Sequence, residues 1–149
     1  MSDTAFSVQV TVDCERPHHL ADWWAETMRW RVEPQDESFI RSMIEQGFAT
    51  DDDTTTHDGK LVWAEATAIG PAEADGPGQP RMLFMKVPEA KSVKNRVHFD
   101  LRTGIDDPTE LDALRQELVE RGASIVGEGR QGPHTWKVMT DPEGNEFCV

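Results

Sequence analysis

Three side chains that could bind a divalent metal fall at related places in the sequence: Gln9, His98 and Glu146. Each belongs to a stretch in which polar and apolar residues alternate, and each is on the polar side. Because successive side chains of a strand point to opposite faces, all three are expected on the face that helices leave open. An imidazole, a carboxylate and an amide oxygen that meet on a curved sheet would suit a hard or borderline divalent ion.

The match between Gln9 and His98 comes from a repeated strand pattern. Residues 6–13 alternate strictly, with the valines on one face. Residues 96–102 repeat this pattern, with Val97 on the core side and His98 on the other. Such period-two alternation indicates half-buried strands, so the chain is expected to contain two related halves.

The order of elements predicts an α+β fold. Helices are expected at 17–28, 36–47 and 108–121, with Thr109 as the N-cap of the last and Gly122 at its end. Further strands are expected at 30–33, 61–69, 81–87, 124–126, 136–140 and 146–149. The acidic stretch 51–59 and the Gly- and Pro-rich stretch 70–80 are expected to be loops, and the run 141–145 a tight turn that makes 136–149 a hairpin.

These elements give each half the order strand, helix, three strands. We therefore predict a single domain over 1–149, with two βαβββ modules at about 5–88 and 95–149 that form one curved mixed sheet with a concave pocket. The helix at 36–47 is an insertion in the first module. The two tryptophans of the first helix, Trp23 and Trp24, are expected in the core.

Composition limits the partners. The formal net charge of −13 disfavours nucleic acid and anionic membranes, because phosphate binding needs an excess of Lys and Arg. The acidity fits either simple solubility or attraction of a cationic ligand. No secretory leader or membrane span is evident, so Cys14 and Cys148 are expected as reduced thiols in a cytoplasmic protein.

Three segments resemble the glyoxalase-like branch of the vicinal-oxygen-chelate superfamily (glyoxalase, bleomycin resistance and dioxygenase proteins): 95–101, Gly122-Ala123 and 136–149. The most specific part is the run Asp-Pro-Glu-Gly-Asn-Glu-Phe at 141–147. The resemblance extends over nearly the whole chain, including 39–47 and 59–63 of the first half. It indicates the fold far better than it indicates the reaction.

The resemblance implies up to four metal ligands, from the first and last strands of each half. Carried over, they are Gln9, His98, Glu146 and an apolar fourth position near Leu83 or Phe84. This departure disfavours a four-ligand glyoxalase I site, and Gln9 in place of a histidine disfavours iron-dependent catechol cleavage. The remaining set better suits Zn, Ni, Co or Mn as a Lewis acid. Alternatively, His98 and Glu146 bind each other or a ligand without any metal.

Two functions stay open from the sequence. One is a metal-dependent lyase, isomerase or ring-opening transferase that acts on a small oxygenated molecule, with Asp100 or Glu65 as base. The other is a protein of the bleomycin-resistance type that sequesters a small molecule, for which five tryptophans and an acidic surface suit a cationic aromatic guest. The resemblance also implies a homodimer. The expected pocket wall comprises Trp63, His134, Trp136 and Cys148.

Overall fold

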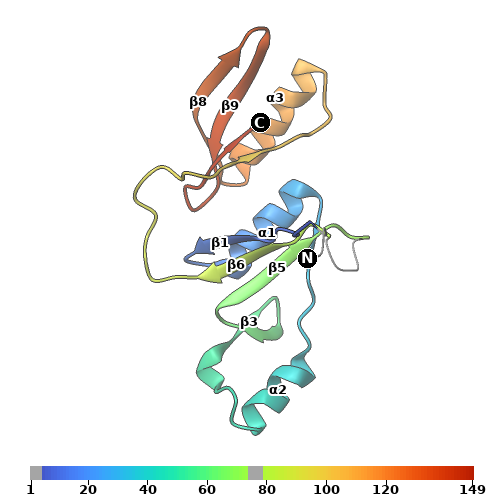
Figure 1. The fold of residues 1–149 in the computed structure, drawn as a ribbon, viewed down its shortest axis with the longest axis vertical. Helices are drawn as coiled ribbons and strands as arrows, with labels where there is room; N and C mark the ends of the chain where they lie inside the picture. The colour runs from blue at the N-terminus through green and yellow to red at the C-terminus, as the bar shows by residue number, and fades with distance from the viewer. Residues whose placement is uncertain (1–4, 74–78) are drawn as a thin grey trace. The chain divides into compact units, whose positions relative to one another are not determined.

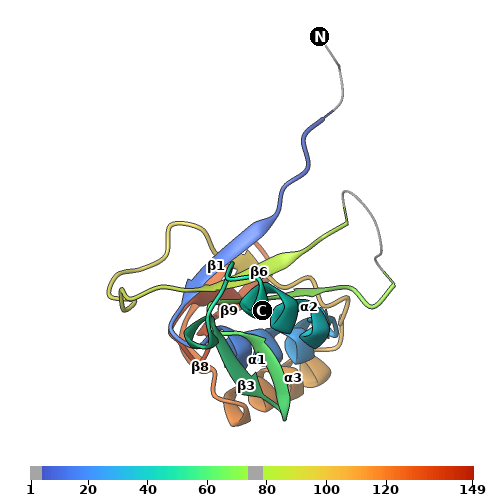
Figure 2. The same ribbon diagram turned by 90° about the horizontal axis from the view of Figure 1, so that it is seen from below.

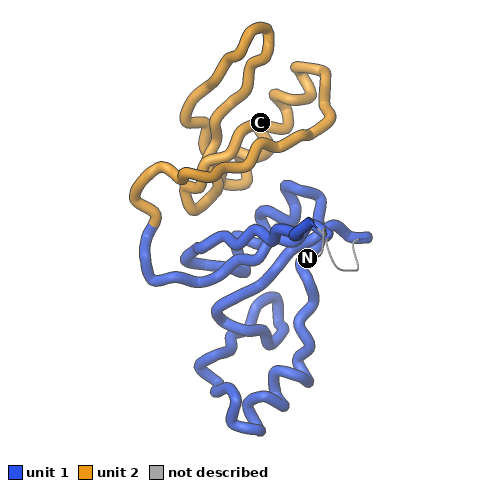
Figure 3. The backbone as a smooth tube through the Cα atoms, viewed as in Figure 1, with its two compact units in different colours: residues 1–90 blue, residues 91–149 orange. Residues whose placement is uncertain are grey.

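The computed structural model describes residues 5–73 and 79–149. The chain divides into two compact units, residues 1–90 and 91–149 (Figure 3). The division falls within the segment 88–95 at which the sequence analysis placed the boundary between the two halves. Each unit has its own sheet and its own hydrophobic core.

Unit 1 is a four-stranded mixed sheet with one helix packed on it and an inserted helix and hairpin (Figure 1). Its elements are β1 (Val10–Cys14), α1 (Pro17–Met28), β2 (Arg31–Val32), α2 (Glu37–Glu45), the 3-10 turn η1 (Asp51–Asp53), β3 (Thr54–His57), β4 (Lys60–Trp63), β5 (Ala66–Gly70) and β6 (Met82–Lys86). The strand order is β1-β6-β5-β2, and β1 runs parallel to β6 beside it (Figures 1 and 2). Helix α1 packs on β5 and β6 and buries Trp23 and Trp24, as expected.

Unit 2 repeats this topology without the insertion. Its elements are β7 (Phe99–Asp100), α3 (Pro108–Glu120), β8 (Ser124–Gln131), β9 (His134–Thr140) and β10 (Glu146–Cys148), in the sheet order β7-β10-β9-β8. In both units the first strand therefore pairs with the last, followed by the third and the second. The α+β class and the two βαβββ modules with an inserted helix are thus confirmed, whereas one curved sheet and a single domain over 1–149 stay predictions.

The first strand of each unit is shorter than its alternating pattern. Val8 and Val97, both expected to face the core, are 83% and 80% exposed. The paired region of β1 begins at Val10, opposite Met82, and that of β7 begins at Phe99. Among the residues that the structure describes, those just before these points pair with no neighbouring strand, so alternation alone does not bury them.

The inserted segment of unit 1 is more regular than the sequence suggested. The stretch 51–59, expected to be a loop, contains η1 and strand β3, and 61–69 is divided between β4 and β5. Strands β3 and β4 form an antiparallel hairpin whose turn residues, Asp58 and Gly59, both have positive φ angles, 49° and 75°. Threonine-rich β3 gains a partner through this turn, which is typical of an Asp-Gly hairpin. Residues 74–78 of the expected loop 70–80 lie outside the described residues.

The start of helix α3 differs from the sequence prediction. The N-cap of α3 is Asp107 and not Thr109: the Asp107 Oδ1 accepts hydrogen bonds from the backbone N–H groups of Thr109 and Glu110 at 2.8 and 3.1 Å. Gly122, with φ 108°, follows the last turn as predicted. Within the part of the chain that the structure describes, no helix has the length and apolar character needed to cross a membrane.

Candidate functional site

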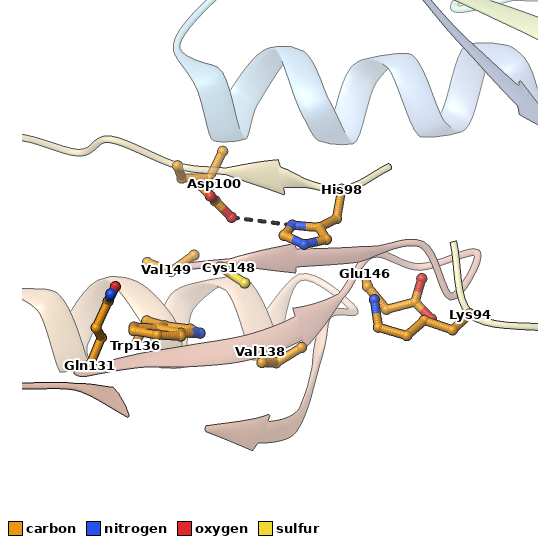
Figure 4. A pocket seen from close by; sticks show the side chains of 10 residues that line it. Lys94, His98, Asp100, Gln131, Trp136, Val138, Glu146, Cys148 and Val149 are labelled. Carbon is orange, nitrogen blue, oxygen red and sulfur yellow. Dashed lines mark ion pairs between the residues drawn. The ribbon is translucent and has the colours of Figure 1, made fainter. Parts of the chain in front are cut away.

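A pocket of about 490 Å³ opens on the sheet of unit 2 (Figure 4). Its polar lining comes from β7, β10, the end of β8 and the segment just before β7, and β9 supplies an apolar wall. The lining residues are Lys94, His98, Asp100, Leu101, Gln131, Trp136, Val138, Glu146, Cys148 and Val149. A cavity of this size is in the range of small-molecule sites.

Strand register explains why polar side chains meet on this face. In the parallel pairing of β7 and β10, Phe99 lies opposite Phe147 and Asp100 opposite Cys148. Phe147 is fully buried, so its neighbours Glu146 and Cys148 point to the other face. His98 joins them by the same alternation. The expectation that His98 and Glu146 share one face therefore agrees with the structure, in which both line the pocket (Figure 4).

The polar centre of the pocket is formed by His98, Asp100 and Cys148. One potential ligand atom from each lies within 4.8 Å of the others. The Nδ1 atom of His98 is 3.2 Å from Oδ1 of Asp100, and the ring's other nitrogen points away from that carboxylate (Figure 4). Nitrogen, oxygen and sulfur donors of this kind are the usual ligands of zinc. These three side chains therefore fit a divalent ion. From the sequence, Asp100 was expected as a base and Cys148 as part of the pocket wall.

The Cys148 side chain is a thiol held by Asp100. Burial, followed by the negative charge of Asp100 and a hydrogen bond with its carboxylate, raises the pKa of Cys148 above its ordinary value. The thiol consequently stays protonated at neutral pH, and its S–H donates to the carboxylate. A protonated thiol is a poor nucleophile, but a bound metal ion would displace its proton.

Glu146 is fixed at a different end of the pocket from Trp136 (Figure 4). Its Oε1 accepts a hydrogen bond from the Lys91 ammonium at 3.0 Å, and its Oε2 accepts one from the Asn95 backbone N–H at 3.0 Å. Its carboxylate is not part of the group formed by His98, Asp100 and Cys148. Neither Lys91 nor Asn95 was predicted as a partner of Glu146; the only signal in the sequence is the cluster of basic residues at 91, 94 and 96, just before His98.

These contacts affect the ionisation of Glu146. Burial alone would raise its pKa, but the hydrogen bonds from the Asn95 N–H and the Lys91 ammonium, together with the Lys91 charge, outweigh that effect and lower it below the ordinary value of 4.5. Because the folded protein holds the ionised form more tightly than the unfolded chain does, the unfolded chain binds more protons near that pH. The resulting stability is present above pH 4.5 and is lost as the pH falls through the lowered pKa.

We expect Glu146→Gln to lose this pH-dependent contribution. The difference in free energy of unfolding between wild type and Glu146→Gln should be constant above about pH 5.5 and should shrink as the pH falls below 4.5. Urea unfolding at several pH values measures it, and Glu45→Gln, an exposed glutamate of unit 1, supplies the baseline. A difference that is equal at acid and neutral pH would contradict the role given to Lys91 and Asn95.

Gln9 has a well-defined place in unit 1. Its Oε1 accepts a hydrogen bond from Arg81 at 2.8 Å, and Arg81 also binds Glu33 through two hydrogen bonds of 2.8 and 2.9 Å. The hydrogen bond with Glu33 raises the pKa of Arg81, which is therefore firmly cationic. The shared site of Gln9 with His98 and Glu146 would join the two units and stays a prediction.

The fourth ligand position needs correction. In unit 1, Val10 lies opposite Met82, just as Phe99 lies opposite Phe147 in unit 2. If Gln9 corresponds to His98, the counterpart of Glu146 is therefore Arg81 and not Leu83 or Phe84. A guanidinium cannot bind a metal ion, since it has no free electron pair to donate.

The other predicted pocket residues are divided between the units. Trp136 and Cys148 line the pocket, whereas His134 is exposed at the start of β9 and is not among the lining residues. Trp63 lies in β4, where its backbone N–H donates to Gln35 and its carbonyl contacts His18. Glu65 is exposed between β4 and β5. Both belong to unit 1, and their predicted roles stay untested.

Trp136 owes its position to a glycine on the adjacent strand. Gly129 lies opposite Trp136 in the β8–β9 pairing, and a Cβ atom at Gly129 would collide with the indole ring. The ring therefore lies against bare backbone, a close approach that glycine permits. Together with Val138, it gives the pocket an apolar wall beside the polar group.

Comparison with known proteins decides the family. The model of the glyoxalase-like domain matches residues 9–149. The chain belongs to the glyoxalase-like domain family. It is thus a member of the vicinal-oxygen-chelate superfamily, as the Asp-Pro-Glu-Gly-Asn-Glu-Phe run suggested. No curated protein is similar enough in sequence to count as a match.

Solved structures share the fold of this glyoxalase-like chain at low sequence identity. A structure described as a possible glyoxalase from Bacillus cereus has a TM-score of 0.57 at 10% identity and covers 98% of each chain. A glyoxalase/bleomycin resistance protein/dioxygenase family enzyme from Burkholderia phytofirmans has a TM-score of 0.55 at 12% identity, covering 95% of this chain and 94% of that chain. The fosfomycin resistance protein FosX from Mesorhizobium loti has a TM-score of 0.56 at 8% identity, covering 99% and 90%. At such identities the likeness concerns the fold alone.

Proposed function

We propose that this chain is a glyoxalase-like enzyme that acts on a small oxygenated molecule in the pocket of unit 2, with a divalent metal held by His98, Asp100 and Cys148. The observation that carries the proposal is the convergence of three ligand-type atoms within 4.8 Å on the wall of a pocket of about 490 Å³. The predicted ligands Gln9 and Glu146 fit less well, because Arg81 and Lys91 already occupy their oxygens.

The residues at the apolar end and those at the polar end of the pocket would have different roles. Trp136 and Val138 would exclude water from one side of the bound molecule and orient it by contact with its carbon skeleton. The Lys94 ammonium, which also lines the pocket, would attract a carboxylate or another anionic oxygen of the molecule. A bound metal would supply Lewis-acid polarisation of an oxygen atom. The proton that Cys148 gives up on metal binding would leave to solvent, so that Asp100 stays an ionised ligand.

Cobalt binding gives a test with a readout other than activity. Wild-type protein titrated with Co²⁺ should show thiolate-to-metal charge-transfer absorption, and Cys148→Ser should lose this band while retaining some metal. His98→Ala should weaken binding by about tenfold or more, since loss of even an outer-shell partner costs about 10–100-fold. Glu146→Gln is the matched comparison, because its carboxylate lies outside the group. A charge-transfer band that survives Cys148→Ser would refute the ligand set.

A second function is favoured by a specific feature of the same pocket. The Trp136 ring lies against Gly129 and forms a wall suited to stacking with a flat guest, as in a protein that sequesters a drug. In that case binding should quench tryptophan fluorescence upon titration with a cationic aromatic antibiotic such as bleomycin. Gly129→Ala, which displaces the ring, and Trp136→Phe should both reduce the response. An unchanged response in both variants would exclude Trp136 as the contact.

We further propose a homodimer in the cytoplasm. The exposed aromatic and aliphatic side chains of Phe6 and Val8 before β1 are the kind of surface that a second copy covers. Neither Cys14 nor Cys148 forms a disulfide bond, which suits a reducing compartment. Sedimentation equilibrium measures the mass, and a monomer at micromolar concentration would rule the dimer out.

A further inference from the structure

Unit 1 contains a second group of ligand-type side chains, separate from the pocket of unit 2. Asp22 on α1, His57 at the end of β3 and Asp58 in the following turn bring one potential ligand atom each within 4.8 Å of the others. The Nε2 atom of His57 is 2.6 Å from Oδ2 of Asp22 and 3.7 Å from Oδ2 of Asp58. The group joins helix α1 to the inserted hairpin.

Two more imidazoles stand beside this group. The ring of His18 stacks on that of His57 with centroids 5.0 Å apart, and the ring of His19 lies 5.3 Å from His57. His18 is buried, and its Nε2 contacts the Trp63 carbonyl at 2.8 Å, which fixes it against the hairpin. His57 ends strand β3, within the stretch 51–59 that was expected to be a loop. Three of the five histidines of the chain thus gather around two carboxylates.

The charges of this arrangement are only partly balanced. Ionised Asp22 accepts hydrogen bonds and donates none, so the Nε2 of His57 carries the proton between them. Asp58 brings a second negative charge toward the same nitrogen. Like charges at such a separation repel each other, and one imidazole shared by two carboxylates offsets the repulsion incompletely. A divalent cation at the point where the three atoms converge would neutralise both carboxylates.

We propose that Asp22, His57 and Asp58 bind a divalent transition-metal ion such as Zn²⁺, with His19 able to complete the shell by rotation of its side chain. On binding, the His57 ring takes the tautomer that is protonated at Nδ1: the Nε2 proton leaves to solvent, a proton from solvent adds at Nδ1, and the Nε2 electron pair binds the metal, so the ring stays neutral. A mixed set of imidazole and carboxylate favours zinc, nickel or copper over calcium or magnesium. The metal would fasten the β3–β4 hairpin to α1. This site is independent of the function proposed for the pocket of unit 2.

The test uses a protein in which the candidate metal site of unit 2 has been removed by mutation. In full-length protein carrying His98→Ala and Cys148→Ser, Zn²⁺ titration by calorimetry should still show binding at about one ion per chain. Adding His57→Gln or Asp58→Asn should weaken that binding by about tenfold or more. Asp52→Asn is the matched control, because Asp52 is an exposed aspartate of the same insertion that lies outside the group. It should leave Zn²⁺ binding unchanged.

Hydrogen exchange gives a second readout that locates the ion. Zn²⁺ should slow amide exchange in residues 54–63 of the background protein, and His57→Gln should abolish this protection. Asp58→Asn serves if His57→Gln does not fold, since Asp58 is exposed in the turn. The proposal is overturned if the background protein binds no Zn²⁺, or if His57→Gln and Asp58→Asn bind it as tightly as the background protein. Loss of Co²⁺ absorption in the pocket of unit 2 has no bearing on either outcome.

Discussion

Replacing Phe147 with alanine is expected to destabilise the protein by about 3–5 kcal/mol, the usual cost of removing a buried phenylalanine ring. Phe147 is fully buried in β10, which lies between β7 and β9 in the sheet of unit 2. It pairs with Phe99 on one side and with buried Met139 on the other. The ring therefore fills the core at the point where the first and last strands of the unit meet.

The same substitution should also disturb the pocket. Glu146 and Cys148 flank Phe147 and hold their positions because that ring anchors the strand to the core. A cavity behind β10 would let the strand shift, so metal or ligand binding should weaken as well. Urea unfolding followed by circular dichroism measures the loss of stability, with Phe48→Ala, an exposed ring in unit 1, as the control that should change little. A cost below about 1 kcal/mol, near the average for point mutations, would show that Phe147 is not a core anchor.

Local patterns in the sequence were sufficient for most of the secondary structure. Helix α1 begins at Pro17 and ends at Met28, as predicted, because its apolar spacing and its proline are local signals. The Asp-Pro-Glu-Gly-Asn turn also made the β9–β10 hairpin readable. The start of α3 was ambiguous because two residues there are acceptable N-caps. Thr109 is one of them, but Asp107 precedes Pro108 and its carboxylate accepts hydrogen bonds from two backbone N–H groups.

The partners of the site residues were not predictable in the same way. Alternation placed His98, Asp100 and Glu146 on one face, since parity needs only the strand itself. That Glu146 binds Lys91 and Asn95, 55 and 51 residues away in the chain, depends on how the connecting segment crosses the sheet. Likewise, Arg81 could not be recognised from the sequence as the counterpart of Glu146. Arg81 and the expected Leu83 lie two positions apart and therefore share a face, so only the observed strand register distinguishes them.

Asp141 is expected to be the most sensitive polar position of unit 2. It is 3% exposed, and its Oδ1 accepts hydrogen bonds from the backbone N–H groups of Glu143 and Asn145, both at 2.9 Å. Both carboxylate oxygens also accept from the Asn145 side-chain amide, at 3.2 and 3.0 Å. Asn145 in turn accepts a hydrogen bond from Asn95, the residue whose backbone N–H holds Glu146.

Asp141→Ala should therefore cost about 3 kcal/mol or more, because it leaves two N–H groups and one amide without their acceptor, at about 1–3 kcal/mol for each buried group. Asp141→Asn keeps one acceptor oxygen and loses the charge, so its cost should be smaller. Asp107→Ala, which removes a carboxylate from the exposed cap of α3, should cost about 1 kcal/mol. Urea unfolding of the three variants ranks them. The prediction is contradicted if Asp141→Ala lowers the free energy of unfolding no more than Asp107→Ala does. Water would then replace the Asp141 carboxylate, and the turn would not depend on that side chain to hold Glu146.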